Sequence, residues 1–344
     1  MAAVPGGLRP AAAPAEAVAA VRAAVAVAAV GVEVDAVDKK ASTPVVVHTS
    51  GMPYRPSITR PAWIDELPQL GVGVGFRRPL ARQIVDHQSE IDFLEIITEH
   101  YLDPTGFHKH ELKELGHRFS LIPHGLSLSP GTAAAAPAHY LQSVSRLTDH
   151  IQPPWWSDHL AMSRVGRIDI GHLSPVLFTE EALDIVCENV FRATTTVGIP
   201  FIIENIAYTL ELPGAQMSEG EFLSRLLART NSGLLLDLMN LYANSVNHSY
   251  DPYEFLSEIP LERVVQVHII GGHFHDGFLV DSHSHSTPRE VWKMLDYVVQ
   301  RAVINAVLLE WDDNFPGIET ILTELAQAKT ILLGRGYERE RVIA

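Results

Sequence analysis

Between residues 71 and 312 the sequence repeats one pattern eight times: a short apolar run rich in β-branched residues, followed by a segment with helical periodicity. Strands that are apolar along their whole length are typical of parallel sheets with both faces buried. Eight such units predict an α/β fold, a single (β/α)8 TIM barrel. The predicted strands are 71–76, 91–97, 117–124, 155–160, 200–205, 232–238, 263–270 and 305–312.

The first 65 residues differ in composition, since they are rich in Ala and Val and low in complexity. Arg22 interrupts their apolar run, which therefore stays shorter than the ~18 residues that a membrane span needs. We predict a disordered extension over residues 1–65, the barrel over 66–335 and a tail over 336–344. We expect no membrane association.

The formal net charge of −15 constrains the partners of this chain. An acidic surface repels phosphate backbones, so we expect no nucleic acid as a partner. The single cysteine, Cys187, excludes an intrachain disulfide. This cysteine usage fits a reducing compartment, and we predict a cytoplasmic protein.

Six consecutive predicted strands, the third to the eighth, end in a histidine or a carboxylate. The carboxyl ends of the strands in a parallel barrel meet at one face, where barrel enzymes carry their active sites. A charged group at the end of a buried strand is costly unless it is paired or bound to a metal. The six residues are His124, His159, Glu204, Asp237, His268 and Glu310.

Each polar residue taken alone has a simpler interpretation. His124 could be a hydrogen-bonded histidine, Glu204 an ion-pair partner, and Asp237 a cap of the following segment. Asn205 and Asn240 would ordinarily be turn residues. The set as a whole favours metal binding, and histidine with carboxylate but without cysteine suits iron, manganese or zinc. The ligands outnumber what one ion takes, which predicts two or three ions.

The segment 268–285 holds five of the 17 histidines of the chain. Asp281 and His283 are two residues apart, so both side chains can point to one side of an extended loop. His273 and His275 share this spacing. They could contact substrate or lie in solvent, and the spacing does not decide between these roles.

Nine motifs together resemble the multinuclear non-haem iron-dependent oxidases, a family with a xylose-isomerase-like barrel that includes the methanobactin-biosynthesis oxidase. The resemblance covers roughly residues 70–330. The motifs are GVGVGFRRP, DFLEIITEHY, PHGLSLS, SDHLAMS, IENIAY, LLLDLMNLYAN, VHIIGG, DSHSH and LLEWDDNFP.

The resemblance implies three groups of metal ligands. One iron would be held by Glu204, Asp237, His268 and Glu310. A second iron would be held by His124 and His159, with Glu204 as a bridge. The residues around a third position would be Asn205, Asn240, Asp281 and His283. Among these residues, Glu204, Asp237 and His283 are expected to be catalytic.

The resemblance also implies the chemistry. Two or three irons, in mixed Fe(II)/Fe(III) states, would use dioxygen to modify a cysteine or a nearby residue of a ribosomal precursor peptide. A separate protein would recognise the leader of that precursor. Three alternatives stay open: a sugar isomerase or epimerase that uses Mn²⁺ or Co²⁺, an apurinic-endonuclease-like phosphodiesterase, and a metal-storage protein without activity.

Overall fold

The computed structural model describes residues 60–102, 106–166 and 168–334, and its centre is a closed barrel of eight parallel strands. The strands are hydrogen-bonded in the order β1-β2-β3-β4-β7-β8-β9-β12, and β12 pairs with β1. Each predicted strand overlaps one of them, which confirms the TIM barrel. The barrel strands are β1 (Gly71–Gly75), β2 (Phe93–Ile97), β3 (Ser120–Gly125), β4 (Trp156–His159), β7 (Phe201–Glu204), β8 (Gly233–Asp237), β9 (Val264–Ile269) and β12 (Ala306–Leu309).

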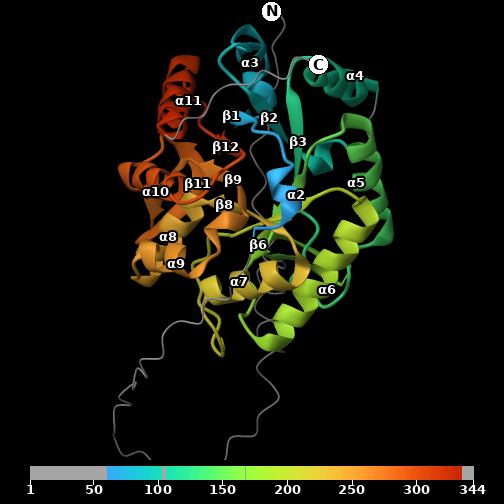
Figure 1. Ribbon diagram of the computed structural model, residues 1–344, viewed down its shortest axis with the longest axis vertical. Helices are drawn as coiled ribbons and strands as arrows, with labels where there is room; N and C mark the ends of the chain where they lie inside the picture. The colour runs from blue at the N-terminus through green and yellow to red at the C-terminus, as the bar shows by residue number, and fades with distance from the viewer. Residues whose placement is uncertain (1–59, 103–105, 167, 335–344) are drawn as a thin grey trace, which may run out of the picture. The chain divides into compact units, whose positions relative to one another are not determined.

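Helices surround the strands as an outer ring (Figure 1). Their apolar faces pack on the barrel. The Ser218 side chain caps α7 because it accepts a hydrogen bond from the backbone N–H of Glu221. The sequence analysis did not predict α8, which follows β8 without a loop. The helices are α3 (Ala81–Asp86), α4 (Gly106–Gly116), α5 (Ala138–Ile151), α6 (Glu180–Val197), α7 (Glu219–Thr230), α8 (Leu238–His248), α9 (Pro252–Glu258), α10 (Arg289–Val299) and α11 (Ile318–Leu333).

The interior of the barrel is apolar toward the amino ends of the strands. A cluster of buried side chains fills it there, and the short helix α2 (Ala62–Asp65) adds Ile64, which is fully buried. In Figure 1 this helix lies near the middle of the ring of helices. The strand and loop residues of the cluster are Phe93, Ile122, Trp155, Ile202, Leu235, Val265, Ala306 and Leu308.

The alternation of side chains along a strand explains why the other end of the barrel is polar. Residues two apart point to the same side of a strand. Ile202 belongs to the inner apolar cluster, and Glu204 therefore points inward one layer higher. The same step leads from Leu235 to Asp237 on β8. An apolar layer thus supports a polar layer above it.

The position of helix α2 differs from the predicted domain boundary at residue 65. The prediction places residues 60–65 in a disordered extension, whereas the structure packs Ile64 into the barrel core. The rest of the predicted extension, residues 1–59, and the predicted tail, 336–344, lie outside the described residues. No helix among the described residues is long and apolar enough to cross a membrane.

Two antiparallel hairpins were not predicted. The first, β5 (Met162–Val165) with β6 (Ile168–Ser174), follows β4, and the second, β10 (Gly271–His275) with β11 (Phe278–His285), follows β9. The second replaces the extended loop that we expected over the histidine-rich segment. Its pairing shifts register between Gly271 and His273, and His283 has a left-handed backbone with φ of 47°. Strict two-residue alternation therefore fails at His283.

We expect Ile64→Ala to lower the free energy of unfolding by about 2–5 kcal/mol, because it empties a fully buried site between α2 and the barrel. Urea unfolding followed by circular dichroism measures the change. Glu66→Ala, at an exposed position beside the helix, is the control and should have almost no effect. Equal stability of the two variants would show that α2 does not support the barrel.

Candidate metal centre

The structure brings the six predicted strand-end residues together at the carboxyl end of the barrel. Their distances define two groups of ligand atoms, and Glu204 belongs to both. Each of the six residues is at most 7% exposed, so their polar atoms are withdrawn from water. The first group is His124, His159 and Glu204, and the second is Glu204, Asp237, His268 and Glu310.

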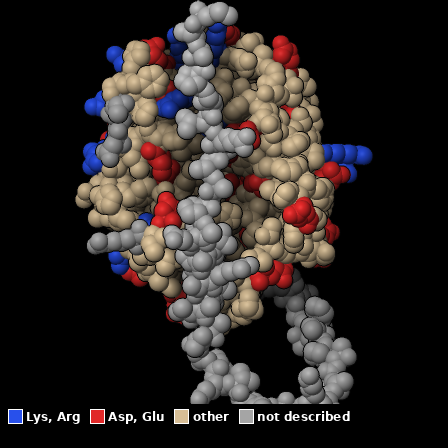
Figure 2. Space-filling model, turned by 180° about the vertical axis from the view of Figure 1, so that it is seen from behind, with Lys and Arg blue, Asp and Glu red and all other residues tan. Residues whose placement is uncertain are grey.

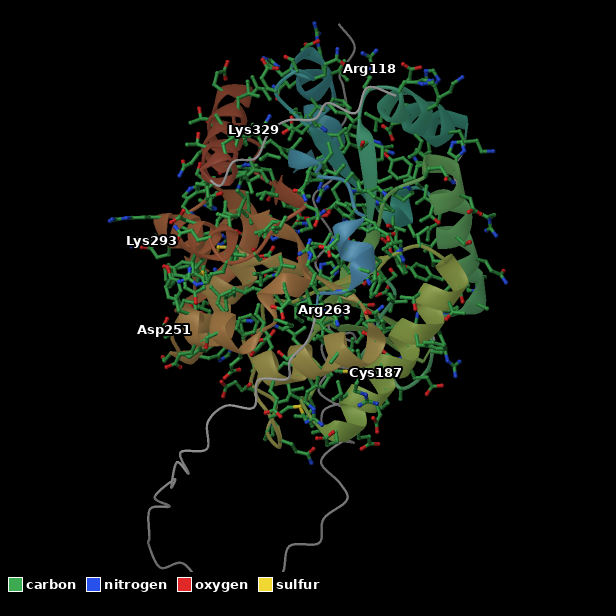
Figure 3. All side chains as sticks on the ribbon, viewed as in Figure 1. Arg118, Cys187, Asp251, Arg263, Lys293 and Lys329 are labelled. Atoms are coloured by element: carbon green, nitrogen blue, oxygen red, sulfur yellow. The ribbon has the colours of Figure 1, made fainter. Side chains whose placement is uncertain are left out.

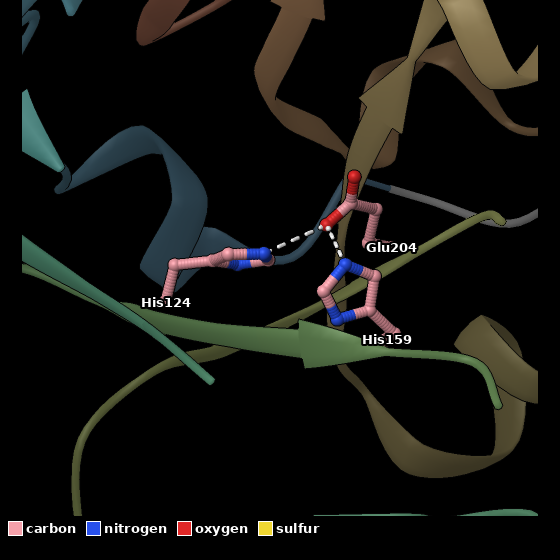
Figure 4. Close-up of side chains that lie close together, drawn as sticks. All are labelled: His124, His159 and Glu204. Carbon is pink, nitrogen blue, oxygen red and sulfur yellow. Dashed lines mark ion pairs between the residues drawn. The ribbon is translucent and has the colours of Figure 1, made fainter. Parts of the chain in front are cut away.

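In the first group two imidazoles face one carboxylate oxygen (Figure 4). The Nε2 atoms of His124 and His159 both lie 3.2 Å from Oε2 of Glu204. The Nδ1 atom of His159 lies 3.1 Å from the carbonyl oxygen of Gly125, which can only accept, so Nδ1 carries the proton. The Nδ1 atom of His124 lies 2.8 Å from Oγ of Ser157.

Both imidazoles of this group are neutral. Burial lowers the pKa of His124 well below its usual value and lowers the pKa of His159 to about 4. In neutral His159 the unprotonated Nε2 directs its lone pair at Oε2 of Glu204. Burial raises the pKa of Glu204 well above its usual value, so in the free protein its carboxyl group holds a proton, which it can donate to only one of the two imidazoles at a time. A metal cation in place of this proton would bind all three side chains, and metals bind the neutral form of histidine.

The second group surrounds His268. Its Nδ1 atom lies 2.9 Å from Oε2 of Glu310, 3.5 Å from Oε1 of Glu204 and 3.9 Å from Oδ2 of Asp237. Glu204 thus directs one carboxylate oxygen to each group. This is the geometry that a carboxylate needs to bridge two ions.

A buried network on the other side of His268 sets the direction of its ring. The Nε2 atom of His268 lies 3.1 Å from Oε2 of Glu95. The Gln266 side chain donates to the same oxygen at 2.6 Å, and Trp155 Nε1 donates to Gln266 at 2.9 Å. Glu95 therefore accepts a hydrogen bond from Nε2–H of His268, and Nδ1 is left facing the other carboxylates. Such a hydrogen bond commonly supports a metal-bound histidine.

Asp237 combines the two roles that the sequence left open. Its Oδ1 atom accepts from the backbone N–H of Asn240 at 2.7 Å and caps α8, while Oδ2 has no hydrogen-bond partner. The Asn205 side chain bonds both to N and to O of Asp237, each at 2.9 Å. Asn240 donates to the carbonyl of Asn205 and keeps a buried, unpartnered Oδ1. Asn205 thus holds Asp237 in place, and Asn240 has an oxygen to offer.

The second hairpin brings Asp281 and His283 to the edge of the cluster. His283 Nε2 lies 2.8 Å from Oδ2 of Asp281, and its Nδ1 lies 3.1 Å from Oδ2 of Asp312 and 3.5 Å from Oε2 of Glu310. Arg77 Nε donates to Asp312 at 2.7 Å and its NH2 group lies 3.1 Å from Oε1 of Glu310. His283, Glu310 and Asp312 form a further possible ligand group.

The remaining histidines of the hairpin lie outside the cluster. His273, His275 and His285 are exposed, and His273 bonds Ser282. The rings of His273 and His285 are 5.4 Å apart, and neither residue belongs to a possible ligand group. Cys187 lies on α6 in the outer helix layer (Figure 3), away from the site.

The cluster opens into a cavity of about 320 Å³, which we call the metal-site cavity. Ile97, Leu126, Ile206 and Leu279 give it partly apolar walls. Figure 2 shows the face opposite to that of Figure 1, where acidic side chains lie around the middle and basic ones nearer to the edge.

The unpartnered atoms show that these residues fit metal ions. Among the described residues, fourteen buried side-chain nitrogen or oxygen atoms have no hydrogen-bond partner. Burying such atoms without a partner is costly, and a convergent set of them is the usual sign of an ion site. Six of them lie here. Two are imidazole nitrogens, His268 Nδ1 and His283 Nε2, which are ion-paired with carboxylates but make no hydrogen bond. The other four are oxygens: Glu204 Oε2, Asp237 Oδ2, Asn240 Oδ1 and Asp281 Oδ1.

Three side chains of this site were not assigned from the sequence. Glu95 was not among the predicted ligands, although it follows Phe93 by two residues and so shares its inward direction. Asp312 lies in the predicted LLEWDDNFP motif and Arg77 in GVGVGFRRP. Arg77 contacts residues 233 and 235 positions away, and Glu95 contacts residues 171 and 173 positions away. No local signal in the sequence reports such pairing.

Residues 71–333 match the family described as the RiPP precursor modification enzyme MbnB/TglH/ChrH. The chain belongs to the MbnB/TglH/ChrH family. RiPPs are ribosomally synthesised and post-translationally modified peptides, so the family consists of enzymes that act on ribosomal precursor peptides. This match confirms the resemblance seen in the sequence motifs.

Relatives of this MbnB/TglH/ChrH member cover most of the barrel. UPF0276 proteins of Caulobacter vibrioides and Rhizorhabdus wittichii are 34% identical over 260 and 259 residues, which is 75% of this chain and 93% of each relative. A UPF0276 protein of Streptomyces avermitilis is 35% identical over 270 residues, 76% of this chain and 55% of the relative.

Solved structures similar to this MbnB/TglH/ChrH member include a D-tagatose 3-epimerase-like protein, with 16% identity, a TM-score of 0.49 and coverage of 78% of this chain and 100% of the other. Endonuclease IV from Thermus thermophilus has 14% identity, a TM-score of 0.48 and coverage of 77% and 100%. Likeness at this level does not bear on function.

We expect Glu95→Gln to weaken metal binding by ~10–100-fold, because the substitution removes the charge that holds the Nε2 proton of His268. Anaerobic titration of the metal-free protein with Co²⁺, followed by its absorption, measures the affinity. Glu90→Gln, at an exposed position just before β2, is the control and should bind as the wild type does. Unchanged affinity in Glu95→Gln would mean that this carboxylate does not orient the ligand.

We also expect metal binding to release protons at pH 7. Burial alone would lower the pKa values of His268 and His283, but the surrounding carboxylates raise both well above the usual value. Burial also raises the pKa of Asp237 to about 7. These groups hold protons in the free protein and must lose them to bind a cation, so affinity should rise between pH 6 and pH 8.

Isothermal titration calorimetry in buffers of different ionisation enthalpy counts the released protons. The slope of the observed binding enthalpy against the ionisation enthalpy of the buffer gives the number of protons. A slope of zero at pH 7 would mean that no proton is released and would contradict the protonated state of the free site.

Proposed function

We propose that this protein is a multinuclear non-haem iron oxidase that uses dioxygen to modify a cysteine, or a residue near it, in a ribosomal precursor peptide. The observation that carries the proposal is the position of Glu204, whose two oxygens face two separate ligand groups. A site for a single ion does not need this arrangement. Membership in a family that modifies ribosomal precursors supports the peptide substrate.

Iron is the proposed metal because imidazole with carboxylate suits it and because the motifs resemble those of iron oxidases. Two or three ions in mixed Fe(II)/Fe(III) states would supply the redox chemistry with dioxygen that protein side chains lack. We propose one ion at His124, His159 and Glu204, and a second at the group around His268.

A third position would lie near Asn240, Asp281 and His283, and we add Asp312 to it as a candidate ligand. Asn205, which was expected at this position, is now proposed as a positioning residue because both ends of its amide bond the backbone of Asp237.

Three residues of the chain are proposed to be catalytic: Glu204, Asp237 and His283. Glu204 holds the two ligand groups at a set separation. Asp237 offers Oδ2 to the ion at the group around His268, since Oδ1 is occupied as the cap of α8. His283 lies at the edge of the metal-site cavity, paired with Asp281, where it can pass a proton toward solvent.

The walls of the metal-site cavity would orient the peptide and limit access of water. The apolar side chains of Leu126, Ile206 and Leu279 line it. Arg77 pairs with Glu310 and Asp312 and so keeps these carboxylates in place. A cytoplasmic location and a separate leader-recognition protein remain part of this proposal, on the grounds of cysteine usage and of the resemblance.

The alternative activities account for less of the site. A sugar isomerase or epimerase would use the group around His268 and would leave His124 and His159 without a role. A phosphodiesterase that acts on DNA would have to overcome the acidic surface. A storage protein would not need the partly apolar cavity into which the ligand groups open.

The test is metal analysis of protein purified without oxygen, followed by incubation with a cysteine-containing precursor and dioxygen. We expect at least two irons per chain and an oxygen-dependent change in peptide mass. Glu204→Gln should lower turnover by more than ~100-fold, beyond the ~10–100-fold typical when a supporting residue is lost. Zinc or manganese alone, or turnover without oxygen, would overturn the proposal.

His285→Ala provides the matched control for these measurements. His285 is exposed at the end of β11, two residues after His283, and contacts no ligand group. Its variant should keep the iron content and turnover of the wild type, whereas His283→Ala should lose iron.

A further inference from the structure

A second cavity, of about 400 Å³, adjoins the metal-site cavity, and Tyr208 lines both. We call it the acidic cavity. Its walls come from the segment after β6, from the connection between β7 and α7, and from α9. The volume is enough for a long side chain, and the shared residue makes the two cavities neighbours.

The polar and aromatic side chains that line the acidic cavity favour a positively charged ligand. It combines aromatic rings with carboxylates, and none of its described lining residues is a lysine, an arginine or a histidine. Aromatic faces and carboxylates together attract cations. The aromatic residues are Phe178, Tyr208, Tyr250 and Phe255, and the carboxylates are Glu211, Glu219, Glu254 and Glu258.

Glu219 has no cationic partner among the described residues. Its Oε2 atom accepts a hydrogen bond from the hydroxyl of Tyr208 at 3.2 Å. Burial raises the pKa of Glu219 to about 8, as expected of a carboxyl group without a positive charge beside it. The nearby Arg225 contacts the sulfur of Met217 but is already paired with Glu180.

The hydroxyl group of Tyr250, in the same cavity, has no hydrogen-bond partner among the described residues. The Oη atom of Tyr250 is buried and makes no hydrogen bond within the described part of the chain. A hydroxyl oxygen can accept a hydrogen bond from an ammonium or guanidinium group. Glu219 and Tyr250 thus offer two hydrogen-bond acceptors in one cavity. No cationic side chain of the described residues binds to either of them.

Tyr208 is held firmly between the two cavities. Its ring stacks on His248, with centroids 4.9 Å apart and planes at 25°. Its backbone N–H donates to Asn244 Oδ1 at 2.9 Å, and its carbonyl oxygen lies 2.9 Å from His248 Nε2. A residue fixed in this way sets a constant separation between the contents of the two cavities.

We propose that the acidic cavity binds a cationic side chain, arginine or lysine, of the precursor peptide while the residue to be modified occupies the metal-site cavity. The identity of the ligand as a peptide rests on the proposed function. An extended chain rises about 3.3 Å per residue, so one tyrosine ring between the cavities corresponds to a cationic residue about one to three positions from the modified one.

The test uses N-acetyl-L-arginine amide as the probe and the full-length protein, with calorimetric titration at pH 9, where Glu219, with its pKa of about 8, is mostly ionised. A ligand of this size should bind with a Kd on the order of 1 mM. N-acetyl-L-norleucine amide, which has a similar length and no charge, should bind at least tenfold more weakly. N-acetyl-L-lysine amide distinguishes a preference for guanidinium from one for any cation.

Two variants locate the binding in the acidic cavity. Glu219→Gln keeps the volume and removes the charge, and it should weaken arginine amide binding by about tenfold or more, the usual effect of losing a charge-assisted hydrogen bond. Tyr250→Phe should weaken it by a smaller factor. Glu181→Gln, exposed in the first turn of α6 and outside the cavity, is the matched control for Glu219→Gln and should have no effect.

Equal affinity for the arginine and norleucine amides would overturn the proposal, and so would unchanged affinity in Glu219→Gln. The measurement needs neither iron nor dioxygen, and metal-free protein should bind the probe as well as loaded protein. The binding result can therefore be interpreted even if the oxidase proposal fails. Failure of the probe to bind would not affect the oxidase test.

Discussion

The constraint on which this structure depends is the burial of Glu204 between three histidines without a hydrogen-bond donor for its Oε2 atom. Burial raises the pKa of Glu204 well above its usual value, because a buried carboxylate that faces the lone pairs of neutral imidazoles is unfavourable unless a proton or a metal cation lies between them. The fold accepts this cost at one end of the barrel. The same cost identifies the site, because stability alone would favour an apolar or a fully paired core there.

The barrel tolerates the polar layer because an apolar layer lies beneath it. On β7 and β8 the inward positions change from Ile202 and Leu235 to Glu204 and Asp237 in one step of two residues. Ile64 of α2 joins the lower layer and closes its amino end. Parallel strands with aligned registers then place all the polar steps at one level, so ligands from distant parts of the chain meet without a dedicated loop.

Supporting contacts decide what each ligand presents to the site. Glu95 occupies Nε2 of His268 and Gly125 occupies Nδ1 of His159, so the two histidines offer opposite nitrogens. Such neighbours make the ligand geometry a property of the barrel rather than of any single side chain. Tyr208 lines both the metal-site cavity and the acidic cavity, so the two cavities are neighbours.

The sequence by itself determined the barrel and the polar ends of six strands, because apolar runs and strand-end residues are local patterns that parallel topology converts into one face. It also pointed to Asp281 and His283, although the expected extended loop is a hairpin with a register shift. Only the tertiary structure decided which atoms are free to bind an ion. Both ends of the Asn205 amide are hydrogen-bonded to the backbone of Asp237, whereas Asn240 keeps an unpartnered oxygen. Three supporting residues act through contacts with distant parts of the chain: Glu95, Arg77 and Asp312. Hydrogen-bond saturation is a property of three-dimensional neighbours, and local patterns of residue type carry no record of it.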